Sequence, residues 1–118
     1  MNTHPTQGRQ ICADVWVDML PDWQSLEAYC DEGLRLSGMT VVSKTHHQFD
    51  PQGITGLWVL AESHFALHTY PEHRFLAMDI FTCGDRQTPE QAIDYVCDQL
   101  GIEAQQRVEI ERGVLRYE

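Results

Sequence analysis

The chain has 118 residues, enough for one domain with one modest hydrophobic core. Hydrophobic residues make up 42% of it, so we expect it to fold rather than to stay disordered. Acidic residues number 18 against 8 Lys and Arg, a formal net charge of −10 with no basic cluster for phosphates, which argues against a nucleic-acid partner.

The sequence also indicates where the protein works. No apolar stretch approaches the length needed to cross a bilayer, and the polar N-terminus lacks the apolar core of a signal peptide. The four cysteines show no CxxC spacing, which is typical of free thiols in a reducing compartment. We therefore expect a cytoplasmic protein without a membrane partner, with a flexible tail at residues 1–8 and a single domain at residues 9–118.

The first half of the chain predicts a strand, a helix and a second strand. Residues 11–19 alternate between apolar and polar side chains, as a strand does. Residues 22–38 form the clearest helix, with Asp22 as its N-cap, apolar residues on one face and Gly38 to end it. Residues 39–49 predict a strand that ends at the turn "DPQG".

The middle of the chain predicts two strands joined very tightly. Residues 54–61 are almost wholly apolar and are expected to form a buried strand, whereas residues 64–70 alternate and end at Pro71. The join between them is "ESH", with no Gly or Pro to make a relaxed turn.

The last third predicts a strand at 74–83, a helix at 88–101 and a short strand at 107–112. Thr88 is the expected N-cap of this helix and Pro89 occupies its first position. The order of strand, helix, several hairpin-linked strands, helix and strand predicts an α+β two-layer sandwich. It consists of a mostly antiparallel sheet with helices on one face.

The segment "AESHFALHTYPE", residues 61–72, gathers acids, a hydroxyl and two histidines. A metal site is one interpretation, because His64 and His68 are four residues apart. However, the interior of this pair lacks the Glu of zincins, and the segment is a predicted strand. A hydrolase triad with Ser63 is another, but the G-x-S-x-G elbow is missing. From the residue types alone, an ordinary strand with a polar, solvated face is the favoured reading, and no metal site is expected.

Several short motifs lie at fixed spacing along the chain. "FDPQGITG", "ESH", "HTYPE" and "TCG" follow one another, with "GRQICADVW" near the start and "ERG" near the end. In order and spacing they resemble the bacterial S-adenosylmethionine decarboxylase proenzymes, and the likeness extends from Gly8 to Gly113. One position departs from the pattern, because Gln10 stands where the family usually has His.

The resemblance implies that the chain makes its own cofactor. Ser63 would attack the carbonyl of Glu62, the peptide bond would become an ester, and elimination would cleave the chain between them. A pyruvoyl group would replace Ser63 and bind the substrate as a Schiff base. His68 matches the family's processing base, and Thr55 matches its processing hydroxyl. The tight "ESH" join is suited to hold a strained peptide bond.

The resemblance also implies how the substrate is held and decarboxylated. The pyruvoyl group serves as an electron sink, as PLP does elsewhere. Cys83 matches the family's proton donor, Phe49 matches an aromatic residue that stacks on adenine, and Glu72 matches an acid that bonds the ribose hydroxyls. Phe65 lies beside the site in sequence and is expected to line the pocket. A homodimer of processed protomers, with residues of both chains at each site, is also implied.

Three functions remain open at this point. The first is S-adenosylmethionine decarboxylase, which supplies the aminopropyl donor for spermidine synthesis. The second is an arginine or ornithine decarboxylase on the same scaffold, and Phe49 and Glu72 favour the nucleoside substrate over these amino acids. The third is an unprocessed homologue that only binds a partner. Against the third, the reactive residues of the family pattern are all present: Glu62, Ser63, His68 and Cys83.

Overall fold

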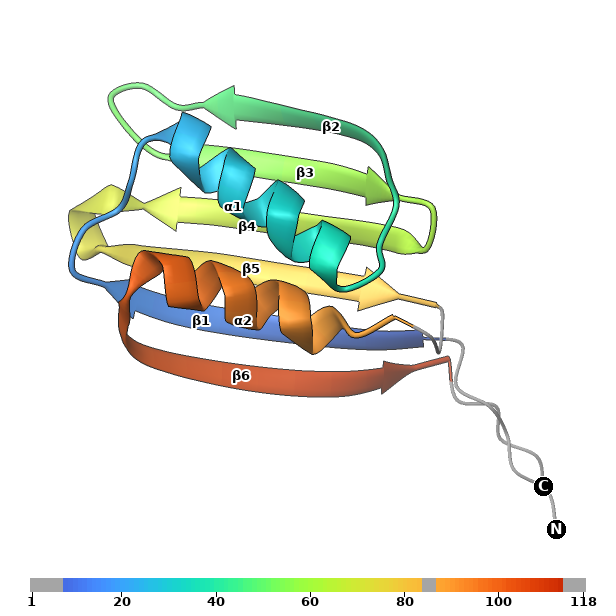
Figure 1. The fold of residues 1–118 in the computed structure, drawn as a ribbon. Coiled ribbons are helices and arrows are strands. Elements are labelled where there is room, and N and C mark those ends of the chain that lie inside the picture. Colours follow the sequence, from blue (N-terminus) through green and yellow to red (C-terminus); the bar gives the residue numbers. More distant parts are fainter. Residues whose placement is uncertain (1–7, 84–86, 114–118) are drawn as a thin grey trace, which may run out of the picture.

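The computed structural model describes residues 8–83 and 87–113, and this part of the chain forms a six-stranded sheet with two helices on one face (Figure 1). Neighbouring strands are antiparallel throughout, in the order β2-β3-β4-β5-β1-β6. The predicted α+β two-layer sandwich is confirmed. The strands are β1 (Gly8–Val17), β2 (Val41–Gln48), β3 (Ile54–Leu60), β4 (Ser63–Tyr70), β5 (Phe75–Thr82) and β6 (Ile102–Arg112), and the helices are α1 (Trp23–Leu36) and α2 (Pro89–Leu100), with a 3-10 turn at Pro71–His73.

The helix ends lie close to where the sequence predicts them. The backbone N–H of Ser25 donates to Asp22 Oδ1 at 2.9 Å, which caps α1, and Gly38 follows its end with a positive φ of 83°. Thr88 occupies the N-cap position of α2, but its hydroxyl donates to Gln91 Oε1 at 2.7 Å instead of accepting from the helix backbone. The position of this cap is therefore as predicted, whereas its hydrogen bond differs.

The hydrophobic core lies between the sheet and the two helices. Trp58 on β3 is buried there, and its Nε1 donates to Asp31 Oδ1 on α1 at 2.8 Å, which ties the sheet to that helix. The helices approach each other closely at Gly33, where a Cβ would lie 2.9 Å from the carbonyl oxygen of Ala92. Other large, fully buried side chains are Leu26, Leu34, Phe65, Leu67, Leu76, Ile80 and Ile93.

The opposite face of the sheet, which we call the open face, has no helix over it among the described residues (Figure 1). The expectation that residues 54–61 form a buried strand is wrong for this reason. Leu57 is 44% exposed and Val59 is 50% exposed, because alternation along β3 turns both side chains away from the helices. The open face also exposes Trp16, Val108 and Ile110.

The ends of the domain differ from expectation in two places. β6 begins at Ile102, directly after α2, and pairs with β1 over most of its length, so it is longer than the predicted strand at 107–112. Gly8 begins β1 instead of belonging to the predicted tail, whose other residues, 1–7, lie outside the described part of the chain. Within the described residues, neither helix is long and apolar enough to cross a bilayer.

Candidate active site

The join between β3 and β4 places Ser63 in an unusual backbone conformation. Leu60 pairs with Ser63 across the hairpin, which leaves only Ala61 and Glu62 in the turn. Ser63 has a φ of 156°, a positive value that non-glycine residues rarely adopt. Such conformations cost roughly 1–3 kcal/mol and are concentrated at reactive sites. The backbone strain expected at the "ESH" join is therefore present at Ser63.

The carbonyl group that precedes Ser63 is held by a backbone donor. The N–H of Cys83, just after β5, donates to the carbonyl oxygen of Glu62 at 3.0 Å. The side chain of Glu62 accepts from the N–H of Thr40 at 3.1 Å, and Ala61 N–H donates to Thr40 O at 2.9 Å. The turn is thereby anchored on two sides. A fixed N–H on a carbonyl oxygen is the arrangement that stabilises negative charge when a nucleophile attacks that carbonyl.

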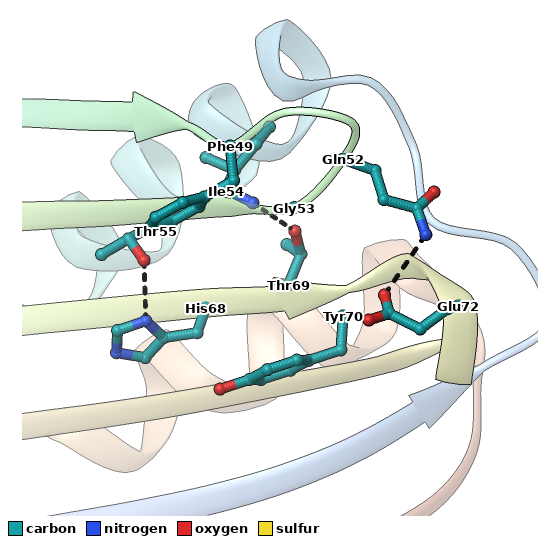
Figure 2. A pocket seen from close by; sticks show the side chains of 9 residues that line it. All are labelled: Phe49, Gln52, Gly53, Ile54, Thr55, His68, Thr69, Tyr70 and Glu72. Atoms are coloured by element: carbon teal, nitrogen blue, oxygen red, sulfur yellow. Dashed lines mark hydrogen bonds between the residues drawn. The ribbon is translucent and has the colours of Figure 1, made fainter.

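A second group of predicted residues lines a pocket of about 380 Å³ at the other end of the hairpin (Figure 2). Thr55 Oγ1 and His68 Nδ1 lie 2.9 Å apart, across the β3–β4 pair that joins the two residues. The pocket is within the usual size range of small-molecule sites. It is lined by Phe49, Gln52, Gly53, Ile54, Thr55, His68, Thr69, Tyr70 and Glu72.

Polar and aromatic groups surround this pocket. Gln52 Nε2 and Glu72 Oε1 face each other at 3.5 Å, and Thr69 Oγ1 accepts from Ile54 N–H at 2.9 Å (Figure 2). Phe49 is 51% exposed, so its ring remains available to a planar ligand. The carboxylate of Glu72 offers acceptors for hydroxyl groups.

The structure divides the predicted site into two groups instead of bringing it together. Ser63 and His68 are five residues apart on the same strand, β4. At 3.2–3.4 Å per residue, their Cα atoms are about 16 Å apart. Glu62 and Cys83 lie at the Ser63 end, whereas Phe49, Thr55 and Glu72 lie at the His68 end. His68 therefore does not reach Ser63 within one chain.

Phe65 lies on the side of the sheet away from Thr55 and His68. It is 1% exposed, belongs to the core and packs edge-on against Trp58 with ring centroids 5.3 Å apart. The expectation that it lines the pocket does not fit this position, because residue 65 of β4 points toward the helices while residues 64, 66 and 68 point to the open face.

The cysteines other than Cys83 have no exposed reactive position. All four thiols are free. Burial raises the pKa of the Cys30 and Cys97 thiols, and partial burial next to Asp79 raises the pKa of Cys12. Only Cys83 is exposed, and it lies beside Glu62.

One polar cluster next to Ser63 is missed by the sequence interpretation. Ser63 Oγ lies 3.5 Å from His64 Nδ1, and His64 Nε2 lies 3.6 Å from Asp79 Oδ2 on β5. Gln10 on β1 donates from Nε2 to the same Asp79 oxygen at 3.1 Å. Alternation alone indicates that His64 faces the open side of β4, but finding Asp79 and Gln10 beside it requires the register of three strands.

Comparison with known proteins confirms the family that the sequence motifs indicate. The sequence profile of the S-adenosylmethionine decarboxylase family matches residues 9–113. A curated S-adenosylmethionine decarboxylase proenzyme of Bacillus cytotoxicus is 35% identical over 122 aligned residues, which cover 100% of this chain and 93% of the relative. The proenzyme 2 of Halalkalibacterium halodurans is 37% identical over 112 residues, 92% of this chain and 88% of that one.

A solved structure agrees as well. The crystal structure of the adenosylmethionine decarboxylase from Aquifex aeolicus superposes with a TM-score of 0.84 at 33% identity, covering 96% of each chain. The chain belongs to the S-adenosylmethionine decarboxylase family.

Proposed function

We propose that the protein is a self-processing, pyruvoyl-dependent S-adenosylmethionine decarboxylase that supplies the aminopropyl donor for spermidine synthesis. Family membership supports the reaction and the substrate. The observation that carries the self-processing is the strained Ser63, whose preceding carbonyl oxygen accepts the Cys83 N–H at 3.0 Å. These residues fit the formation of a pyruvoyl group at position 63.

Self-processing begins with an acyl shift. Ser63 Oγ forms a bond to the carbonyl carbon of Glu62 and gives its proton to a base. The Cys83 N–H stabilises the negative charge on the carbonyl oxygen. The bond from this carbon to the Ser63 nitrogen then breaks, and the nitrogen takes up a proton. The peptide bond has become an ester, and the strain at Ser63 favours leaving the starting conformation.

The second stage cleaves the chain. A base, to which we assign His68, removes the α-proton of residue 63, and the Cβ–Oγ bond breaks to release Glu62 as a carboxylate. The dehydroalanine that remains takes up water and loses ammonia, which leaves the pyruvoyl group at the new N-terminus. Thr55 Oγ1, at 2.9 Å from His68 Nδ1, orients the imidazole for this step.

Decarboxylation uses both groups of residues. Position 63 would carry the pyruvoyl group, which would supply the carbonyl for the substrate's amine and the electron sink for the loss of CO₂. We assign the return of a proton to carbon to Cys83, which is exposed beside position 63. We assign stacking on adenine to Phe49 and acceptance of hydrogen bonds from the ribose hydroxyls to Glu72, and their position in the lining of one pocket supports this assignment. Four free thiols fit a cytoplasmic enzyme.

Two copies of the chain complete each site in this proposal. Ser63 and His68 are about 16 Å apart on one strand, and the open face exposes apolar side chains that include Leu57 and Val59. In the proposed dimer, the open faces of two copies contact each other. The two-fold axis lies between the two sheets, perpendicular to the strands, and therefore reverses the strand direction in the second copy. The Ser63 end of one chain then lies opposite the partner's His68.

Co-expression of two inactive variants tests the shared site. Ser63→Ala and His68→Ala are each expected to remain uncleaved when expressed alone. In a mixed dimer, the His68→Ala chain keeps Ser63 and receives His68 from the Ser63→Ala partner, so it is expected to cleave. If the His68→Ala chain stays intact in purified mixed dimers, the two residues do not act across an interface.

Substrate choice is tested by CO₂ release from S-adenosylmethionine, arginine and ornithine in parallel. S-adenosylmethionine is expected to be preferred, and Phe49→Ala and Glu72→Gln are expected to raise its KM without preventing self-cleavage. Glu103→Gln, an exposed acid outside the pocket, serves as the matched control. A preference for arginine or ornithine would contradict the proposed substrate while leaving the self-processing intact.

A further inference from the structure

We propose that His64 is the base that takes the Ser63 hydroxyl proton in the acyl shift, and that Asp79 and Gln10 hold His64 in position. This inference rests on the proposed self-processing. It assigns a role to three residues that the family resemblance leaves without one in this chain.

The first support is the contact between His64 and Ser63. Consecutive residues of a strand point to opposite faces, so their side chains do not normally meet. Here the positive φ of Ser63 departs from a regular strand, and Ser63 Oγ lies 3.5 Å from His64 Nδ1. Contacts between a nucleophile and its base are often this long before the reaction begins. The strained backbone thus places the imidazole beside the nucleophile.

The second support is the group on the other ring nitrogen. His64 Nε2 lies 3.6 Å from Asp79 Oδ2, and a carboxylate there favours a proton on Nε2. Nδ1 then carries the lone pair and faces the Ser63 hydroxyl. A serine, a histidine and an acid in this order have the roles of nucleophile, base and orienting group. In this chain the nucleophile attacks the protein's own backbone.

The third support is that Asp79 is itself held. Gln10 Nε2 donates to Asp79 Oδ2 at 3.1 Å, and Gln10 Oε1 accepts from Arg112 Nη1 on β6. The ring centroids of Phe81 and His64 are 5.9 Å apart, and the Arg112 guanidinium lies over the Phe81 ring. The polar chain therefore crosses from β4 through β5 and β1 to β6. It gives Gln10 a function at the position where it departs from the family pattern.

Self-processing requires two proton removals, and we assign them to two different histidines. The hydroxyl proton of Ser63 must leave in the acyl shift, and the α-proton of residue 63 must leave in the elimination. Within one chain, His64 is next to the hydroxyl, whereas His68 is about 16 Å along the strand and forms a hydrogen bond with Thr55. The partner's His68, which the proposed dimer brings to position 63, is assigned the α-proton. In the acyl shift, His64 takes the hydroxyl proton and returns it to the Ser63 nitrogen as the carbon–nitrogen bond breaks.

The test follows self-cleavage of freshly synthesised protein by gel and mass, with and without hydroxylamine. Hydroxylamine cleaves an ester but not a peptide bond, so it reveals whether the acyl shift has occurred. His64→Ala is expected to cleave at least about a hundredfold more slowly, the loss expected for a general base, and to yield no hydroxylamine-dependent fragments. His68→Ala is expected to yield them. His73→Ala removes an exposed histidine outside the cluster and is the control.

Imidazole and a second variant separate chemistry from folding. Added imidazole is expected to restore cleavage to His64→Ala, because it supplies the missing base. Asp79→Asn is introduced both into the wild-type chain and into His64→Ala. It is expected to slow cleavage in the wild-type background but not the imidazole-rescued cleavage of His64→Ala, since Asp79 acts only through His64. Thermal unfolding of each variant identifies any that fails to fold, and Asp79→Asn then carries the test.

Each result bears on one proposal only. Cleavage of His64→Ala at the wild-type rate, or its conversion to fragments by hydroxylamine, overturns the role of His64, since the acyl shift would have proceeded without it. An Asp79→Asn variant that cleaves as fast as the wild type overturns the role of Asp79. A wild-type chain that never cleaves contradicts the proposed function itself.

Discussion

Replacement of Thr55 by Val tests the part of the site that the structure defines most closely. The change removes the hydroxyl that lies 2.9 Å from His68 Nδ1 and keeps a β-branched side chain on β3. A neutral hydrogen bond contributes about 0.5–1.5 kcal/mol net. If the variant loses this free energy in the elimination step, cleavage slows by roughly 2- to 13-fold, since 1.36 kcal/mol corresponds to a factor of ten in rate.

The assay is a time course of self-cleavage after synthesis, with the ester measured by hydroxylamine. Thr55→Ser is the matched control, because it keeps the hydroxyl and is expected to cleave within about twofold of the wild type. Thr55→Val is expected to accumulate ester, since the acyl shift at Ser63 does not use His68. Equal rates for the Val and Ser variants, in chains of equal thermal stability, would refute the orienting role of Thr55.

Three further predictions concern Cys83, the helix pair and the buried thiols. Cys83→Ala keeps the backbone N–H on Glu62, so it is expected to self-cleave but to decarboxylate about 10²- to 10⁴-fold more slowly; unchanged turnover would remove the proton-donor role. Gly33→Ala is expected to cost about 1–3 kcal/mol in thermal unfolding, because its Cβ would lie 2.9 Å from a backbone oxygen of α2; a melting temperature equal to the wild type's would contradict this close packing. Cys30 and Cys97, whose pKa values burial raises, are expected to resist iodoacetamide at pH 8 until the chain unfolds, since less thiolate is present at a given pH; rapid labelling of either in the folded protein would contradict their burial.

Periodicity and capping were sufficient to predict the layers of this fold. The alternation in β1 and β5, Asp22 before α1 and the glycines after both helices are local signals, and local signals determine where elements begin and end. The prediction of a buried strand at β3 is wrong because an unbroken hydrophobic sequence does not show which faces of the strand are covered. Leu57 and Val59 lie on the open face, and only the three-dimensional arrangement reveals it.

The arrangement of the candidate site also depends on the three-dimensional structure. The motifs identify Ser63, His68 and Cys83 as candidates, but their distances depend on strand register, which sequence spacing does not provide. The register brings the Cys83 N–H to the Glu62 carbonyl and leaves His68 about 16 Å from Ser63 along β4. It also aligns a histidine, an aspartate and a glutamine from three different strands, a cluster without any signature in the linear sequence.

The most direct test of self-processing at Ser63 is the intact mass of the purified protein under denaturing conditions, with Ser63→Ala measured alongside. We expect two fragments from the wild type, residues 1–62 and residues 63–118, with a pyruvoyl group in place of Ser63 and no free amine at that end. Ser63→Ala is predicted to give one uncleaved chain. A wild-type protein that also gives one uncleaved chain would contradict self-processing at the Glu62–Ser63 bond, and with it the proposed source of the cofactor.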